Sequence, residues 1–207
     1  MRLVDDDLAD QKILEDIIEE AKPPVPANAR HLHWLLATPF RYAPGIGGSR
    51  FRARGDPGVF YGALRQRTAC AEAGFWKWRF VRDSIGLTRL DAHSMSLFPA
   101  SVRGRAWNLT RPPQSRNSKA WTHPTDYAPT QALGSRARGE AIQVLVYESV
   151  RDPRRGDCIA VLDPAALVNG EPLARAQSWY LTVREHGVIW QRDRRQVFQF
   201  DFRVFEA

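Results

Sequence analysis

Apolar and polar positions alternate most regularly over residues 197–205, which predicts a strand with one packed face and one solvated face. The packed face is expected to hold Phe198, Phe200, Phe202 and Val204. Shorter apolar runs of strand length, several rich in β-branched residues, predict further strands. These cover residues 58–64, 141–147, 158–162, 177–184 and 188–191.

Helical spacing of apolar residues is found in three segments. Residues 68–82 carry an apolar stripe, and residues 124–138 open a helix for which Gly139 is a stop signal. Residues 1–22 predict an acidic amphipathic helix that ends at Pro23-Pro24. This N-terminal helix either packs on its own domain or contacts a partner or a second copy of the chain.

The remaining segments complete a pattern in which strands outnumber helices. Residues 33–42 are interpreted as extended, 43–57 as a loop rich in Gly, Pro and Arg, and 112–122 as a polar loop. Residues 92–110 mix strand-like alternation with turns. The predicted fold class is therefore α+β, with a mixed, mainly antiparallel sheet and flanking helices.

Length and composition favour one domain, or one domain with an added arm. The chain has 207 residues, of which 43% are apolar, and this is enough to bury a core. A membrane-spanning helix needs roughly 20 apolar residues, and every apolar run is shorter. The N-terminal pattern predicts no secretory signal. With only two cysteines besides, the expected location is the reducing cytoplasm.

Charge is distributed unevenly along the chain. The formal net charge is +7, but residues 1–22 alone carry −5, so the rest carries +12. A basic body favours an anionic partner, such as nucleic acid, a nucleotide or an acidic protein.

Common catalytic and cofactor motifs are missing from the sequence. It contains no GxxxxGK[ST], GxGxxG, HExxH, GxSxG or CxxC pattern. Only His31 and His33 lie close together among five histidines, and two histidines without a third ligand do not predict a metal site. We therefore expect no metal.

Polar residues interrupt several otherwise apolar segments. A carboxylate at Glu72, flanked by small and aromatic residues on a predicted helix, is costly to bury unless it meets a cation or a ligand. The other candidates are Arg41, Tyr42, Arg50, Tyr61 and Ser149. Each also has a structural interpretation: an ion-pair network for the charged residues, a satisfied core hydroxyl for Tyr61 and a turn for Ser149.

At these residues the sequence resembles the RES domain, a family named for its Arg, Glu and Ser that supplies the toxins of RES–Xre toxin–antitoxin modules. The resemblance lies in an ordered set of stretches across residues 31–165. They are Phe40-Arg41-Tyr42, Gly48-Ser49-Arg50-Phe51, Pro57-Gly58-Val59-Phe60-Tyr61-Gly62-Ala63, Thr68-Ala69-Cys70-Ala71-Glu72, Trp121-Thr122-His123-Pro124-Thr125-Asp126-Tyr127-Ala128 with Gln131-Ala132-Leu133, and Tyr147-Glu148-Ser149-Val150-Arg151-Asp152-Pro153.

The resemblance implies a split sheet like that of ADP-ribosyltransferase toxins, clasping NAD in a central cleft. It also implies a single RES domain over residues 25–207, preceded by the N-terminal helix over 1–24. The C-terminal strands over 177–205 match the motifs less well and are expected to complete the sheet or edge the cleft. In family terms the NAD site is lined by Arg41, Tyr42, Arg50, Tyr61, Glu72 and Ser149, with Arg41, Tyr61 and Glu72 catalytic.

The implied activity is cleavage of the nicotinamide–ribose bond, with water or inorganic phosphate as acceptor and NAD as substrate rather than cofactor. Guanidinium groups suit the diphosphate, although Arg52 and Arg54 follow Arg50 closely and leave open which arginine reaches it. Tyr61 suits stacking. Glu72 suits the cationic transition state, a ribose hydroxyl or activation of water. Ser149 suits a hydrogen bond rather than nucleophilic attack.

The resemblance further implies a cognate Xre-type antitoxin, through which any association with DNA would be indirect. A homo-oligomer stays open. One alternative activity is ADP-ribosylation of a target protein on the same fold. Two others are a nucleic-acid-binding module, suggested by the basic charge, and an inactive scaffold.

Overall fold

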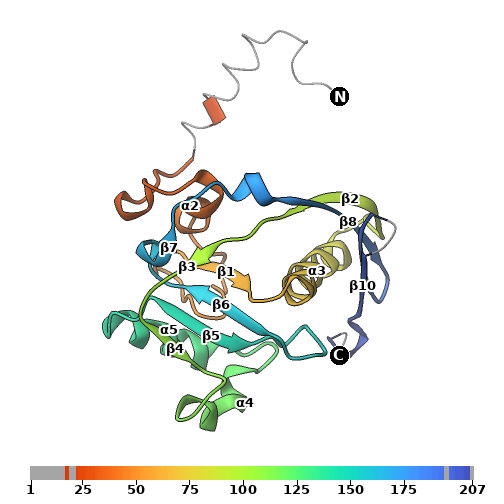
Figure 1. Ribbon diagram of the computed structural model, residues 1–207. Helices are drawn as coiled ribbons and strands as arrows, with labels where there is room; N and C mark the ends of the chain where they lie inside the picture. Colours follow the sequence, from red (N-terminus) through yellow and green to blue (C-terminus); the bar gives the residue numbers. More distant parts are fainter. Residues whose placement is uncertain (1–16, 19–21, 194–195, 206–207) are drawn as a thin grey trace.

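The computed structural model describes residues 17–18, 22–193 and 196–205. These residues form two four-stranded sheets with helices packed around and between them (Figure 1). The first has the order β1-β6-β5-β4 and is antiparallel except where β4 runs parallel to β5. Its strands are β1 (Phe60–Ala63), β4 (Ala106–Asn108), β5 (Val144–Glu148) and β6 (Asp157–Val161).

The second sheet has the order β10-β9-β8-β2 and is antiparallel throughout. Its strands are β2 (Leu90–Leu97), β8 (Gln177–Arg184), β9 (Gly187–Arg192) and β10 (Gln196–Asp201). A small pair joins β3 (Ser101–Val102) to β7 (Leu167–Val168). The predicted α+β class with a split, mainly antiparallel sheet is thus confirmed.

Helix α3 (Gln66–Asp83) lies between the two sheets (Figure 1). Its buried positions, among them Cys70, Phe75 and Trp78, pack on Trp179, Trp190 and other residues of the second sheet. The helix also contacts β1 and β6 of the first sheet. The predicted helix over 68–82 is therefore confirmed, and its central position places Glu72 between the sheets.

Helix α5 (Ala128–Gly139) covers one face of the first sheet, where Leu133 and Ala137 pack against Leu145 and Ala160. Helix α2 (Trp34–Arg41) covers the other face against Val144 and Val161. The smaller helical segments are α4 (Ser118–Trp121) and the 3₁₀ turns η1 (Ala27–Ala29), η2 (Gln114–Asn117), η3 (Pro164–Ala166), η4 (Pro172–Arg175) and η5 (Arg203–Phe205).

Three local predictions were wrong. Residues 33–42 are not extended: His33 caps α2 by accepting from the Leu35 N–H, and burial of Leu36 and Phe40 favours the helix. The polar loop over 112–122 contains η2 and α4. The last strand ends at Asp201 and turns into η5, which leaves Val204 78% exposed instead of packed. The predicted N-terminal helix lies largely outside the described residues, of which Ile17 and Ile18 are helical and exposed.

Gly134 allows α5 to touch the loop between α2 and β1. A Cβ at this position would lie 2.5 Å from the carbonyl oxygen of Phe51, a backbone atom that cannot move aside cheaply. We expect Gly134→Ala to lower the free energy of unfolding by about 1–3 kcal/mol, as overpacking does.

The matched control for Gly134→Ala is Gly139→Ala at the end of the same helix, because its new Cβ would have no atom within 4 Å. The control is expected to leave stability unchanged or raise it by up to about 1 kcal/mol. Urea denaturation of both variants measures the difference. Equal stabilities would contradict the close approach of α5 to Phe51.

Candidate active site

Glu72 is held by the turn that follows β5. The Ser149 hydroxyl donates a hydrogen bond of 2.5 Å to Oε1 of Glu72, and the Cys158 thiol lies 4.0 Å from the same oxygen. Both contacts fall on Oε1. The carboxylate is half-buried, and within the described part of the chain neither contact uses its second oxygen, Oε2.

Ser149 is itself held in place by burial and by two backbone hydrogen bonds. It is fully buried, and its Oγ accepts from the N–H groups of Arg151 at 3.2 Å and Asp152 at 2.9 Å. Because two backbone donors fix the hydroxyl oxygen, its proton points at Glu72. The arrangement orients the carboxylate.

Two further contacts join the same turn to α3. The Thr68 hydroxyl donates to Oδ2 of buried Asp152 at 2.8 Å, and the Arg151 guanidinium lies over the ring of Phe75. Positions 68, 72 and 75 are spaced by four and three residues, so they share one face of the helix. We call the set Thr68–Asp152, Glu72–Ser149 and Phe75–Arg151 the α3 clasp.

Arg50 binds the loop before α5. Its Nη1 donates to the carbonyl oxygens of Trp121 and His123, each at 3.0 Å. The guanidinium also lies 4.7 Å from the centroid of the Tyr127 ring, a cation–π arrangement. Arg50 therefore fixes residues 121–127 while being only 9% exposed itself.

Tyr61 fastens the segment that carries Arg50 to β1. Its hydroxyl is 2.8 Å from Oγ of Ser49 and accepts from the Phe51 N–H at 3.0 Å. Burial of the hydroxyl raises the pKa of Tyr61, and its hydrogen bonds oppose the shift. The phenol is protonated at neutral pH, and the residue retains 37% exposure, so its ring can meet a ligand.

Contacts around buried Tyr147 bring these groups to the same end of β5. Its ring lies 4.9 Å from that of Phe51, the neighbour of Arg50, and its cross-strand partner Cys158 lies 4.0 Å from Oε1 of Glu72. Burial raises the pKa of Tyr147 most, and the charges of Cys158, Glu72 and Tyr61 raise it further, whereas Arg50 lowers it. Burial likewise raises the pKa of the Cys158 thiol to about 12, with Glu72 as the second cause. The structure therefore brings Arg50, Tyr61, Glu72 and Ser149 together.

Arg41 and Tyr42 lie at the C-terminal end of α2. Nε of Arg41 donates to the carbonyl oxygen of Pro23, and Tyr42 is 40% exposed. A Cβ at Gly58 would lie 2.3 Å from Cα of Phe40, so the end of α2 packs directly on the segment that leads into β1. This contact, rather than the α3 clasp, positions Arg41.

The arginines that follow Arg50 differ from it in their surroundings. Nε of Arg52 donates to the carbonyl of Asp56 at 3.0 Å, and burial, then Arg138, lowers the pKa of Arg52. Arg54 is exposed. Arg50 is the member of this group that is buried and bonded to the loop before α5.

Sequence reasoning missed Arg151 and Tyr127 as parts of the site. Burial lowers the pKa of Arg151, while Tyr127 and then Glu72 oppose the shift, and the Arg151 N–H shares the Ser149 hydroxyl with Glu72. Both residues lie within stretches that carry the family resemblance. The contact between the Tyr127 ring and Arg50, however, is visible only in the structure.

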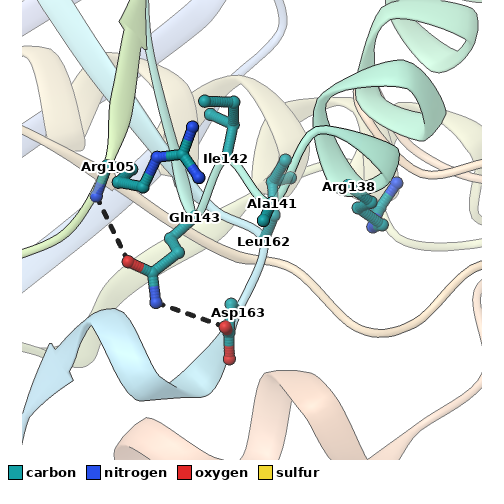
Figure 2. A pocket seen from close by; sticks show the side chains of 7 residues that line it. All are labelled: Arg105, Arg138, Ala141, Ile142, Gln143, Leu162 and Asp163. Atoms are coloured by element: carbon teal, nitrogen blue, oxygen red, sulfur yellow. Dashed lines mark hydrogen bonds between the residues drawn. The ribbon is translucent and has the colours of Figure 1, made fainter.

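A cavity of about 400 Å³ lies elsewhere, at the start of β5 (Figure 2). Gln143 bridges its rim, accepting from the Arg105 N–H at 3.2 Å and donating to Asp163 at 3.3 Å. Arg138 also lines it but pairs with Asp56 at 3.3 Å. Because Glu72 meets Ser149 beyond the opposite end of β5, this cavity is separate from the candidate site.

Within the described part of the chain, no group of three or more His, Cys, Asp or Glu residues could hold a metal ion. His33 and His123 instead accept backbone hydrogen bonds at a helix start and in a turn. Both cysteines are free and buried. Among the residues searched, no helix is long and apolar enough to cross a membrane.

The RES domain family model matches residues 25–184, and the chain belongs to this family. The match includes every residue of the α3 clasp, together with Arg41, Arg50 and Tyr61. RES domains are associated with toxin–antitoxin modules and with NAD. A search of curated proteins found no match.

Ser149→Ala tests the clasp. The substitution removes the donor to Glu72 and leaves the N–H groups of Arg151 and Asp152 without their acceptor. An unsatisfied buried polar group costs about 1–3 kcal/mol, so we expect a loss of stability in that range by urea denaturation. Ser94→Ala, at an exposed position of β2, is the control expected to change nothing. A Ser149→Ala variant as stable as the control would contradict the burial of these contacts.

Proposed function

We propose that this protein degrades NAD by cleaving the bond between nicotinamide and ribose, with water or inorganic phosphate as the acceptor. The observation that supports the proposal most is the hydrogen bond from Ser149 that orients the Glu72 carboxylate, near the end of β5 where Tyr61 holds the segment of Arg50 and Phe51 contacts Tyr147. Family membership supports an NAD-acting enzyme in general.

The chemistry needs a fixed negative charge more than it needs an acid. As the C–N bond breaks, its electron pair neutralises the nicotinamide ring, so the leaving group requires no proton. Positive charge develops on the ribose, and a preorganised carboxylate at Glu72 stabilises it. The oxygen of water or phosphate then bonds to the ribose carbon. When water is the acceptor, the displaced proton passes to Glu72 or to solvent.

The remaining residues suit binding of the substrate. Arg50 offers a guanidinium for a phosphate of NAD, and Arg41, at the end of α2, is a second candidate. The partly exposed ring of Tyr61 suits stacking on the nicotinamide or ribose, with Tyr42 as an exposed neighbour of Arg41. Ser149 acts as a positioning residue for Glu72, since its proton is committed to the carboxylate.

Such an enzyme consumes a metabolite of its own cell and needs restraint. The RES family implies a toxin–antitoxin partner in general. We propose a cognate Xre-type antitoxin that blocks the site, with any DNA association passing through it. Basic residues near Glu72 would favour a carboxylate-bearing segment of that partner.

The direct test incubates purified protein with NAD, with and without inorganic phosphate, and separates the products. Nicotinamide with ADP-ribose is the expected result for water as acceptor. Nicotinamide with ADP-ribose-1″-phosphate, formed only when phosphate is present, is expected for phosphorolysis. Intact NAD in every sample would overturn the proposal, and label from NAD appearing on an added protein would favour ADP-ribosyl transfer instead.

Glu72→Gln keeps the shape of the side chain and removes its charge. We expect the rate of NAD cleavage to fall by about 10²–10³-fold, as loss of one transition-state electrostatic contact does. Glu140→Gln is the control, because Glu140 forms an exposed ion pair with Arg136 at the end of α5. Cleavage undiminished in Glu72→Gln would reject the site.

Arg50→Lys tests substrate binding. Lysine keeps the charge but loses the planar fork that suits phosphate and the stacking on Tyr127. We expect KM for NAD to rise about tenfold, from the loss of roughly 1.4 kcal/mol of binding energy. The exposed Arg54→Lys, four positions later, should leave KM unchanged. Equal KM values for the two variants would argue against phosphate binding by Arg50.

A further inference from the structure

Arg151 is a buried cation enclosed by two aromatic rings. It is 4% exposed, and its Cζ lies 3.8 Å from the centroid of Phe75 and 4.3 Å from that of Phe205. Phe75 belongs to α3, whereas Phe205 ends the C-terminal turn η5. The side chain therefore joins the carboxylate-bearing helix to the C-terminal segment.

Arg151 contacts both the Ser149–Glu72 pair and the loop that binds Arg50. Its backbone N–H donates to Oγ of Ser149, the hydroxyl that orients Glu72. Its Nη2 donates to the carbonyl oxygen of Pro124 at 2.6 Å, within the loop whose neighbouring carbonyls bind Arg50. Displacement of Arg151 would therefore disturb the surroundings of Glu72 and Arg50 together.

Aromatic faces compensate part of this buried charge, beside the hydrogen bond to Pro124 and the influence of Tyr127 and Glu72, which raise the pKa of Arg151. Among the described residues Arg151 forms no ion pair within 4.0 Å, and its buried Nη1 has no hydrogen-bond partner. A desolvated cation over an aromatic face is stabilised more than an exposed one. The rings of Phe75 and Phe205 therefore supply electrostatic as well as packing energy.

Phe205 lies beyond the family match, which ends at residue 184. Its place is fixed by the turn, in which its N–H donates to the carbonyl of Phe202 at 2.9 Å, and by an edge-on contact with Phe75 at 5.2 Å. Val204, its neighbour, is 78% exposed. The turn therefore directs one aromatic ring, Phe205, at Arg151.

We propose that Phe205 is a positioning residue for NAD cleavage, which it supports by holding Arg151 against the Ser149–Glu72 pair. The C-terminal turn η5 thus helps to set the geometry of the site, in addition to ending the second sheet. This inference rests on the proposed function.

The test compares Phe205→Leu, Phe205→Tyr and Val204→Ala in the full chain. Leucine keeps an apolar side chain and removes the aromatic face, tyrosine keeps the face, and Val204→Ala is the adjacent control. For each protein, NAD cleavage gives kcat and KM, thermal unfolding gives Tm, and amide hydrogen exchange reports on residues 121–127 and 149–152.

We expect Phe205→Leu to lower kcat about tenfold, equivalent to roughly 1.4 kcal/mol in the barrier, with KM within twofold. Phe205→Tyr and Val204→Ala should stay within twofold of the original kcat. Exchange at 121–127 and 149–152 should be faster in Phe205→Leu alone.

Three results would overturn the inference. The first is an unchanged kcat in Phe205→Leu, and the second is an equal loss of kcat in the leucine and tyrosine variants. The third is a loss of kcat that parallels the loss of Tm across Phe205→Leu, Phe205→Tyr and Val204→Ala. If the unsubstituted protein leaves NAD intact, the proposed function fails by itself. Hydrogen exchange then still decides the positioning role, because unchanged exchange in Phe205→Leu rejects it without reference to NAD.

Discussion

The clasp between α3 and the turn after β5 is the constraint on which the candidate site depends. Three contacts on one helix face, at Thr68, Glu72 and Phe75, are met by three residues within four positions of the turn. The helix also packs on the core of the second sheet through Cys70, Phe75 and Trp78. A carboxylate carried by a packed helix and fixed by the Ser149 hydrogen bond loses little further freedom on binding a ligand, which is the condition for electrostatic preorganisation.

Two buried arginines give the site its other half. Arg50 and Arg151 both donate to carbonyl oxygens of the loop before α5, and both lie over aromatic rings. Burial of a cation is costly unless hydrogen bonds or rings compensate it. These hydrogen bonds help to hold the loop over 121–127, and the loop in turn fixes the position of both guanidinium groups.

Several elements followed from local sequence because their signals are local. The helix that carries Glu72 has its apolar stripe, and strands β1, β5, β6, β8 and β9 have their β-branched or alternating runs. Residues 33–42 were misjudged because a short apolar run fits either a strand or a buried helix, and only packing of Leu36 and Phe40 on the first sheet decides between them. The prediction that Val204 is packed was wrong for the opposite reason. The alternation of apolar and polar residues continues to Val204 in the sequence, but the strand has already given way to the turn η5.

The sequence by itself determined the α+β class and, through the RES resemblance, named Arg50, Tyr61, Glu72 and Ser149, which the fold gathers. The fold class and these residues could be predicted because strand and helix periodicity and ordered motifs are properties of the local sequence. Tertiary structure alone decided that Arg50, rather than Arg52 or Arg54, is the buried arginine that joins the loop before α5, and that Arg151 stands between Phe75 and Phe205. The physical reason is that burial and long-range contacts depend on which segments meet in space, as Phe205 and Arg151 do although they lie far apart in the sequence.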